Sequence, residues 1–264
     1  MAALAIFGIT GRMGQSLVRA LRDTPAFSLS GAIASATSER LGQDAAGEGA
    51  PTGVLITSDP SLGVRGASVA VDFSSSSGVA AHAQACAAAG VPILIGATAL
   101  DAASRAELTR TARNIAVLIA PNTSVGVSVV AELVSMATLK LGSAYDVEIF
   151  EAHHRMKRDA PSGTALALGQ AVAGARGRDL DEVAVYDRAG HGAPRSAGSI
   201  GFSSSRAGDI VGEHTVTFAA AGERIEITHR ATDRITFARG ALRAAEWLIG
   251  QPAGLYGMKN VLGL

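Results

Sequence analysis

The first half of the chain alternates between short apolar runs and segments with helical character. The apolar runs lie at residues 2–7, 27–33, 69–73, 92–95 and 115–120. Nearly continuous apolar runs are typical of parallel strands that are covered on both faces. The segments that read as helices lie at residues 16–22, 78–89 and 101–113. Repeated strand–helix units of this kind predict an α/β fold with a Rossmann-type parallel sheet and helices on both sides.

The pattern changes after residue 124. Residues 125–141 predict a long helix, and residues 146–151 alternate as a strand that leads into a basic loop. Further segments, at residues 183–186, 198–206, 213–219 and 224–230, read as strands. Alternation favours antiparallel pairing, so an α+β domain with an open mixed or antiparallel sheet is expected. The face of that sheet left free by its helices predicts a homo-oligomer.

Two domains follow from these patterns. Residues 235–249 again have helical spacing and are expected to return to the first domain. We therefore predict a dinucleotide-binding domain from residues 1–124 and 234–264. Residues 125–233 are predicted to form a second domain for substrate binding and oligomerisation.

A glycine turn follows the first strand. Gly8, Gly11 and Gly14 recur every third residue, and Thr10 occupies the second glycine of the strict G-x-G-x-x-G pattern. Gly8 would allow the tight turn, Gly11 the approach of backbone to a pyrophosphate, and Gly14 close packing of helix on strand. Strand, glycine turn and helix in this order predict nucleotide binding.

Ligands of open parallel sheets bind beyond the carboxyl ends of the strands. We therefore expect the nucleotide along one rim of the sheet. The predicted contacts are Gly8, Ile9, Thr10, Gly11, Arg12, Met13, Phe73, Gly96, Ala97, Thr98, Ala120, Pro121, Asn122 and Thr123.

The end of the second strand lacks an acid. NAD-selective sites usually place Asp or Glu there to hold the ribose hydroxyls. This chain has the segment from Ala34 to Ser38, and its next acid is Glu39. Nothing there repels a 2′-phosphate, and Ser35, Ser38, Arg12 or Arg40 could bind one. We expect NADPH to be accepted at least as well as NADH.

A basic block follows the strand predicted at residues 146–151. It contains His153, His154, Arg155, Lys157 and Arg158, with only Met156 between them. Pro161, Ser162, Gly163 and Thr164 then lead into a helix, and Pro suits a first helical turn. Cationic side chains beside free helix amides favour a small anion. His153 titrates near neutrality and Lys157 normally keeps its proton, a pairing that suits proton delivery.

Other interpretations of the basic block stay open at this point. A charge run is commonly a solvated loop. A nucleic-acid patch disagrees with the neutral chain and the scarce aromatics. A metal site from His153, His154 and Glu151 lacks further His or Cys ligands, so no metal is expected.

Composition adds few constraints. The 264 residues contain 23 Lys+Arg and 23 Asp+Glu, so no global field recruits nucleic acid or membrane. A single cysteine, Cys86, fits a reducing compartment. No stretch reaches the ~18 apolar residues of a membrane helix, and the first strand carries no basic leader. A cytoplasmic location is expected.

With these segments in place, the chain resembles the dihydrodipicolinate reductase (4-hydroxy-tetrahydrodipicolinate reductase) family over essentially its whole length. The resemblance rests on residues 11–14, 151–165, 198–202, 206–214 and 223–230. It implies reduction of 4-hydroxy-tetrahydrodipicolinate to tetrahydrodipicolinate with NADPH or NADH, in lysine and diaminopimelate synthesis. It also implies a homotetramer built through the second domain's sheet.

The resemblance assigns roles within the basic block. In similar enzymes the residue at His153 is the proton donor or acceptor, and the residue at Lys157 is the general acid. His154, Gly163 and Thr164 match positions that bind the substrate dicarboxylate, and we add the amide of Ser162 to this clamp. Two departures concern the cofactor: Ala34 and Ser35 replace a frequent Glu-Arg pair, and Ala97 stands where threonine is common.

Two other functions are also compatible with the sequence alone. One is another two-domain dehydrogenase that acts on a sugar or an amino acid. The other is a nucleotide-sensing binding protein without turnover. Cofactor preference, oligomer number, domain closure and the hydroxylation state of the substrate do not follow from sequence physics.

Overall fold

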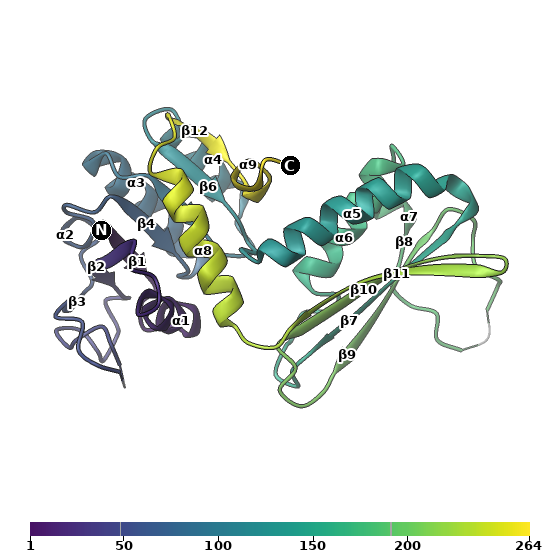
Figure 1. Ribbon diagram of the computed structural model, residues 1–264, viewed down its shortest axis with the longest axis horizontal. Helices are drawn as coiled ribbons and strands as arrows, with labels where there is room; N and C mark the ends of the chain where they lie inside the picture. The colour runs from purple at the N-terminus through teal and green to yellow at the C-terminus, as the bar shows by residue number, and fades with distance from the viewer. Residues whose placement is uncertain (48, 191) are drawn as a thin grey trace. The chain divides into compact units, whose positions relative to one another are not determined.

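The computed structural model describes residues 1–47, 49–190 and 192–264 (Figure 1). Within these residues the chain forms two compact units. The first unit consists of Met1–Val125 and Arg234–Leu264, and the second of Gly126–Asp233.

The first unit is built on a parallel sheet of seven strands. The strands are β1 (Ala2–Phe7), β2 (Phe27–Ile33), β3 (Ile56–Thr57), β4 (Val69–Asp72), β5 (Ile93–Ile95), β6 (Ala116–Ile119) and β12 (Gly254–Tyr256). Their order in the sheet is β12-β6-β5-β4-β1-β2-β3. All five strands predicted from apolar runs are confirmed. The sequence analysis missed β3 and β12, which have two and three residues and form the two edges.

Helices cover both faces of this sheet. They are α1 (Arg12–Leu21), α2 (Pro60–Gly63), α3 (Val79–Ala89) with the 3₁₀ turn η1 (Ser76–Gly78), α4 (Ala102–Thr111), α8 (Ile235–Leu248) and α9 (Met258–Leu262). Asp101 caps α4 by accepting the Ser104 N–H at 2.7 Å, so it precedes the helix rather than lying in its first turn. The predicted return of the C-terminal helix to the first unit is confirmed.

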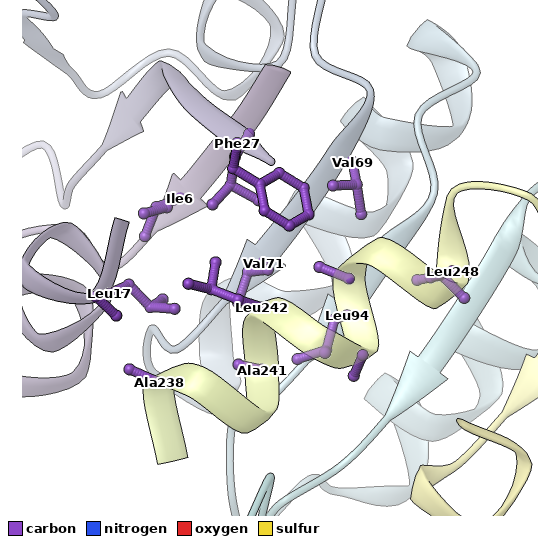
Figure 2. Close-up of a cluster of buried hydrophobic side chains, with 14 of the residues drawn as sticks. Ile6, Leu17, Phe27, Val69, Val71, Leu94, Ala238, Ala241, Leu242 and Leu248 are labelled. Atoms are coloured by element: carbon purple, nitrogen blue, oxygen red, sulfur yellow. The ribbon is translucent and has the colours of Figure 1, made fainter. Parts of the chain in front are cut away.

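Alternate residues of each strand enter different cores, as the pleat requires. Leu4, Ile6 and Val71 face a cluster formed with α1, α8 and α9. Figure 2 shows part of this cluster, with Leu17 of α1 and Leu242 of α8 directed toward the strands. Intervening strand residues pack on the other face against α3 and α4. Burial on both faces explains why these strands carry so few polar residues.

The second unit contains a five-stranded sheet. Its elements are α5 (Val125–Leu141), η2 (Gly142–Ala144), β7 (Asp146–His153), α6 (Gly163–Ala175), α7 (Leu180–Val183), β8 (Ala184–Val185), β9 (Ile200–Arg206), β10 (Gly212–Ala220) and β11 (Glu223–Ala231). The order is β11-β10-β7-β9-β8. Only the pairs β11–β10 and β10–β7 are antiparallel, because β9 runs parallel to both β7 and β8. The alternation of apolar and polar residues along β9 does not distinguish parallel from antiparallel pairing.

One face of this sheet packs against helices. Val134 of α5, Leu168 and Val172 of α6 meet Ile149 and Phe218 of the sheet in one buried cluster. Along β10 the buried and partly exposed residues alternate, so the opposite face stays more open. The predicted open, mixed sheet is thereby confirmed.

One helical segment of the described chain departs from the sequence expectation. Val125–Ala144 is long and apolar enough to cross a membrane by length and composition, with a mean hydropathy of 1.5. Glu132 and Lys140 are the two charged residues of this segment. Length and composition alone are weak evidence for a membrane span when only one helix of the described chain has them.

Candidate active site

The carboxyl ends of four adjacent parallel strands meet at one edge of the first unit's sheet. β1, β4, β5 and β6 end in register at their last residues, which are Phe7, Asp72, Ile95 and Ile119. The residues that follow these ends are Gly8, Phe73, Gly96 and Ala120. Four of the segments predicted to bind a nucleotide therefore begin at the edge where open α/β sheets take their ligands.

The glycine turn after β1 leaves no room for a side chain at two positions. Gly8 has a φ of 75°, and a Cβ there would lie 2.8 Å from backbone atoms of Phe73 and Ser74. A Cβ on Gly14 would lie 2.4 Å from the carbonyl oxygen of Gly8. Gly11 is the N-cap of α1 and offers no side chain to its free amides. Such a turn exposes backbone N–H groups to a pyrophosphate.

A cavity of about 510 Å³ opens beside this turn. Five predicted nucleotide contacts line it, namely Gly8, Thr10, Gly11, Ser35 and Phe73. Ala34, which the sequence places at the end of the second strand without an acid, also lines it. The other lining residues were not expected from the sequence; they are Ser74, Ser75, Ser77, Gly78 and His82. Within the described chain this lining is rich in hydroxyl groups and contains no carboxylate.

A hydrogen-bonded pair, Asp72 and His82, supports the cavity wall. Asp72 is fully buried, and its Oδ2 lies 2.8 Å from Nδ1 of His82. The other oxygen of Asp72 accepts the Ser74 N–H at 2.8 Å. The imidazole also stacks on the Phe7 ring, with centroids 4.2 Å apart. The one sequence signal for this pair is an acid at the end of an otherwise apolar strand.

The remaining residues predicted at this edge do not line the cavity. Ile9 is fully buried, and the hydroxyl of Thr123 donates to the Phe237 carbonyl at 2.7 Å. A Cβ on Gly96 would lie 2.2 Å from the Phe73 ring, so this glycine makes room for the ring. Arg12, Thr98 and Pro121 are exposed, Met13 and Asn122 are partly buried, and Ala97 and Ala120 are buried.

In the second unit, β7 carries a carboxylate and an imidazole side by side. The strand continues to His153, two residues beyond the predicted end, so this histidine belongs to the strand and not to the loop. Residues two apart on a strand share a face. Glu151 is accordingly close to His153, with its Oε2 2.5 Å from Nδ1. Glu151 is completely buried and His153 is 9% exposed.

An arginine on the neighbouring strand completes this pair. Arg206 is the register partner of His153 on β9. Its Nη1 and Nη2 donate to the two oxygens of Glu151, at 2.9 Å and 2.7 Å. Nη2 also donates to the carbonyl of Asp159 at 2.6 Å, and the Asp159 carboxylate holds Lys157 Nζ at 2.8 Å. Arg206 was not expected in the site from the sequence, where it lies 55 residues from Glu151.

The start of α6 is fixed by a serine and a second histidine. Ser162 is the N-cap and accepts the Ala165 N–H at 3.1 Å, so the proline before it lies outside the helix and not in its first turn. The Ser162 hydroxyl lies 2.9 Å from Nε2 of His214, and both side chains are buried. Gly163 and Thr164 form the first residues of the helix, one exposed and one partly buried.

These groups form one connected cluster. The His214 ring meets the His153 ring edge-on, with centroids 5.1 Å apart. His214 thus links the Glu151–His153 pair to the N-terminus of α6, and Arg206 links the same pair to the loop that carries Lys157. His154 is partly buried beside them. Of the basic block, Arg155 and Arg158 are exposed, as a solvated loop would be.

Burial and charge set the protonation of the cluster. Burial would raise the pKa of Glu151, but hydrogen bonds from Arg206, Ser204 and His153 prevail and lower it to about 2. Burial lowers the pKa of His153, although Glu151 opposes this shift. Burial, followed by the charge of His153, lowers the pKa of His214 to about 3. The cluster therefore contains a firmly ionised carboxylate and a neutral His214. Within the described residues, no three His, Cys, Asp or Glu side chains converge to hold a metal ion.

Solved structures share this architecture. A dipicolinate-bound dihydrodipicolinate reductase from Paenisporosarcina sp. TG-14 is 24% identical, with a TM-score of 0.76 over 98% of this chain and 99% of that one. A myo-inositol dehydrogenase from Corynebacterium glutamicum is 14% identical, with a TM-score of 0.60 over 96% of this chain and 90% of its own. At these identities the likeness shows the fold alone, which hosts different substrates.

Sequence relatives are closer. A 4-hydroxy-tetrahydrodipicolinate reductase from Anaeromyxobacter dehalogenans is 49% identical over 266 residues, covering 100% of this chain and 98% of the relative. One from Thiobacillus denitrificans is 49% identical, covering 99% and 98%. Residues 2–123 match the family model of the dihydrodipicolinate reductase N-terminus, and residues 126–262 match that of the C-terminus. The chain belongs to the dihydrodipicolinate reductase family.

Proposed function

We propose that the protein reduces 4-hydroxy-tetrahydrodipicolinate to tetrahydrodipicolinate, a step of lysine and diaminopimelate synthesis, with His153 and Lys157 as its proton-transfer pair. The 4-hydroxyl group leaves as water together with a hydrogen from the adjacent ring carbon, and one hydride and one proton then add to the resulting double bond. The observation that carries the proposal is the cluster of Glu151, His153 and Lys157 beside the α6 start, in a chain that belongs to the reductase family.

The second unit would bind the dicarboxylate. The amides at Ser162, Gly163 and Thr164 form a helix start, which favours one carboxylate of the ring. His154 would bind the substrate beside them. Lys157 would donate a proton to the ring, and His153 would orient or relay it. The nearby cations stabilise the negative charge that builds on the ring.

The first unit would hold a pyridine nucleotide. The steric need for glycine at positions 8 and 14 and the hydroxyl-lined cavity support this fit. Gly8–Met13 would hold the pyrophosphate, Ser35 the adenosine ribose, and Phe73, Gly96–Thr98 and Ala120–Thr123 the rest of the nucleotide. When bound, the reduced nicotinamide supplies the hydride.

We infer that NADPH serves at least as well as NADH. The cavity lining has Ala34 and Ser35 after β2, and no acid there repels a 2′-phosphate. Ser35 already lies 2.8 Å from the Thr37 hydroxyl, so two hydroxyl groups are available together. The test compares kcat/KM for the two cofactors at saturating substrate. A hundredfold preference for NADH would overturn this part of the proposal.

Assembly and location are further parts of the proposal. The more open face of the second unit's sheet carries Phe150 at 42% exposure, which favours a homotetramer formed through this face. Analytical ultracentrifugation tests the oligomer number, and a monomer at micromolar concentration would contradict it. A cytoplasmic location is a prediction that cell fractionation can check.

One activity experiment separates the candidate functions. The protein is incubated with NADPH or NADH and freshly prepared 4-hydroxy-tetrahydrodipicolinate, and the nicotinamide absorbance is followed. We expect substrate-dependent oxidation of the nucleotide. Oxidation only with an inositol or an amino-acid-derived imine would favour another dehydrogenase, and nucleotide binding without turnover of any of these would favour a sensor.

A further inference from the structure

Glu151 is a buried carboxylate that no step of the proposed reaction uses. Its side chain is completely enclosed, and a buried charge is costly unless it is paired and hydrogen-bonded. Here the bidentate guanidinium of Arg206 neutralises it, and each of its oxygens accepts a short bond from Arg206. An ion pair of this geometry holds the carboxylate in a single orientation.

That orientation fixes the imidazole of His153. The carboxylate accepts a hydrogen bond from Nδ1 at 2.5 Å, so Nδ1 carries a proton and the other nitrogen, Nε2, is the one that exchanges. Nε2 lies beside Gly212, where a Cβ would come within 3.1 Å. The edge of the His214 ring limits rotation on another side. The imidazole of His153 is thus held by its hydrogen bond to Glu151, by the backbone of Gly212 and by the ring of His214.

The same arginine reaches the lysine of the pair. Arg206 Nη2 donates to the carbonyl of Asp159, and the carboxylate of that residue binds Lys157 Nζ. One guanidinium on β9 therefore connects the carboxylate behind His153 with the loop that presents Lys157. Parallel pairing of β7 and β9 brings residues 55 positions apart into this contact.

Charges from every neighbouring element act on His153. Glu151 on its own strand favours the imidazolium, whereas Arg206 on β9 and Lys157 in the following loop disfavour it. His214 on β10 stays neutral, and His229 lies opposite His214 on β11. Among these described neighbours, Glu151 is thus the group that supports a positive charge on His153.

We propose that Glu151, anchored by Arg206, is a positioning residue that keeps Nδ1 of His153 protonated and directs Nε2 to the bound dicarboxylate. This inference rests on the proposed function, since it gives His153 a role in proton transfer. It adds a residue pair, Glu151 and Arg206, to which the proposed reaction assigns no contact with substrate or cofactor.

The test replaces Glu151 by glutamine, which keeps the shape and removes the charge. The matched control is Glu148→Gln, a partly exposed carboxylate on the same strand that binds Arg188 and Arg195. We expect kcat of Glu151→Gln to fall about 10- to 100-fold, part of the usual general acid–base contribution. The inhibition constant of dipicolinate should change less than about threefold, because the substitution does not alter the backbone amides at the start of α6 that would bind its carboxylate. The control should retain both values.

The pH profile distinguishes positioning from general damage. Loss of the carboxylate disfavours the imidazolium, so the basic limb of kcat in Glu151→Gln should move to lower pH. Glu151→Asp keeps the charge near both partners but shortens the side chain, so it should lose rate while its basic limb stays near that of wild type. If Glu151→Gln does not fold, as thermal melting would reveal, the aspartate variant alone decides: wild-type kcat would overturn the inference.

Two failures are distinguishable. If the wild-type protein does not reduce the substrate, the proposed function fails. If the wild type turns over and Glu151→Gln matches Glu148→Gln in kcat and in pH profile, only the positioning role fails. An NMR titration of ¹³Cε1-labelled histidine gives a readout without substrate: the His153 pKa should be lower in Glu151→Gln, and an unchanged pKa would contradict the inference.

Discussion

Replacing Ser162 by alanine removes one hydroxyl that serves two partners. The Ser162 oxygen caps α6 by accepting the Ala165 N–H, and it also lies 2.9 Å from Nε2 of His214. His214 is 4% exposed, and its Nδ1 has no hydrogen-bond partner within the described residues. Without Ser162 the imidazole would lose the one hydrogen-bond partner that the described residues give it.

The magnitude follows from these two losses. Removing a serine N-cap costs about 1 kcal/mol. Leaving a buried polar atom without its partner costs about 1–3 kcal/mol. The free energy of unfolding of the second unit should therefore fall by about 2–4 kcal/mol. Substrate affinity should fall as well, because the same cap orders the amides of Gly163 and Thr164.

Urea unfolding followed by circular dichroism measures the first quantity, with nucleotide omitted so that binding does not mask the loss. Ser203→Ala serves as the matched control, because Ser203 is an exposed serine on β9 of the same unit. A double-mutant cycle with His214→Phe then separates the cap from the imidazole contact. We expect a coupling energy of about 1 kcal/mol or more.

Two results would refute this reasoning. A loss below about 0.5 kcal/mol for Ser162→Ala would mean that neither contact stabilises the unit. A full loss that persists unchanged in the His214→Phe background would assign the whole effect to the cap. In that case the hydroxyl–imidazole contact would have no energetic role.

Other predictions concern the catalytic pair, the clamp, the turn and acid stability. His153→Ala and Lys157→Ala should each lower turnover about 10²-fold or more in the nicotinamide assay, and near-wild-type turnover of both would contradict their assignment. Thr164→Ala should act mainly through KM, so an unchanged KM counts against the clamp. Gly14→Ala should abolish nucleotide binding in calorimetry or prevent folding, because a Cβ would meet backbone at 2.4 Å; wild-type affinity would exclude the steric argument. The pKa of His214 is lowered to about 3, so the unfolded state binds more protons below about pH 6.5, and urea midpoints should fall from pH 7 toward pH 4. The fall should be smaller in His214→Gln, and an equal fall would assign the acid sensitivity to other groups.

Much of the fold follows from local pattern. The bounds of β1, β2 and α5 equal the predicted ones, because long apolar runs or helical periodicity extend over the whole element. The strands β3 and β12 were missed because two or three residues contain too little periodicity. Gly90 ends α3 in the left-handed region, which glycine takes at no steric cost, so a glycine directly after helical spacing is a local signal for the end of a helix.

Only part of the candidate site is readable in the same way. The glycine turn, the end of the second strand with Ser35, and the basic block are each a short continuous segment of the sequence. Residue types and their spacing within each segment therefore identify them. The partners that orient these groups come from distant segments: Arg206 lies 55 residues from Glu151, and His214 lies 52 residues from Ser162. No local pattern records such a pairing.

The sequence by itself determined the order of the longer strands and helices, the two kinds of sheet and the residues that can carry charge or protons. The tertiary structure alone decided that β9 runs parallel to β7, which brings a guanidinium against a buried carboxylate. It also decided that Asp72 meets His82 beside the cavity at the glycine turn. The physical reason is that periodicity reports which face of an element is buried, whereas hydrogen bonds between buried polar groups depend on the register of strands that fold together from distant parts of the chain.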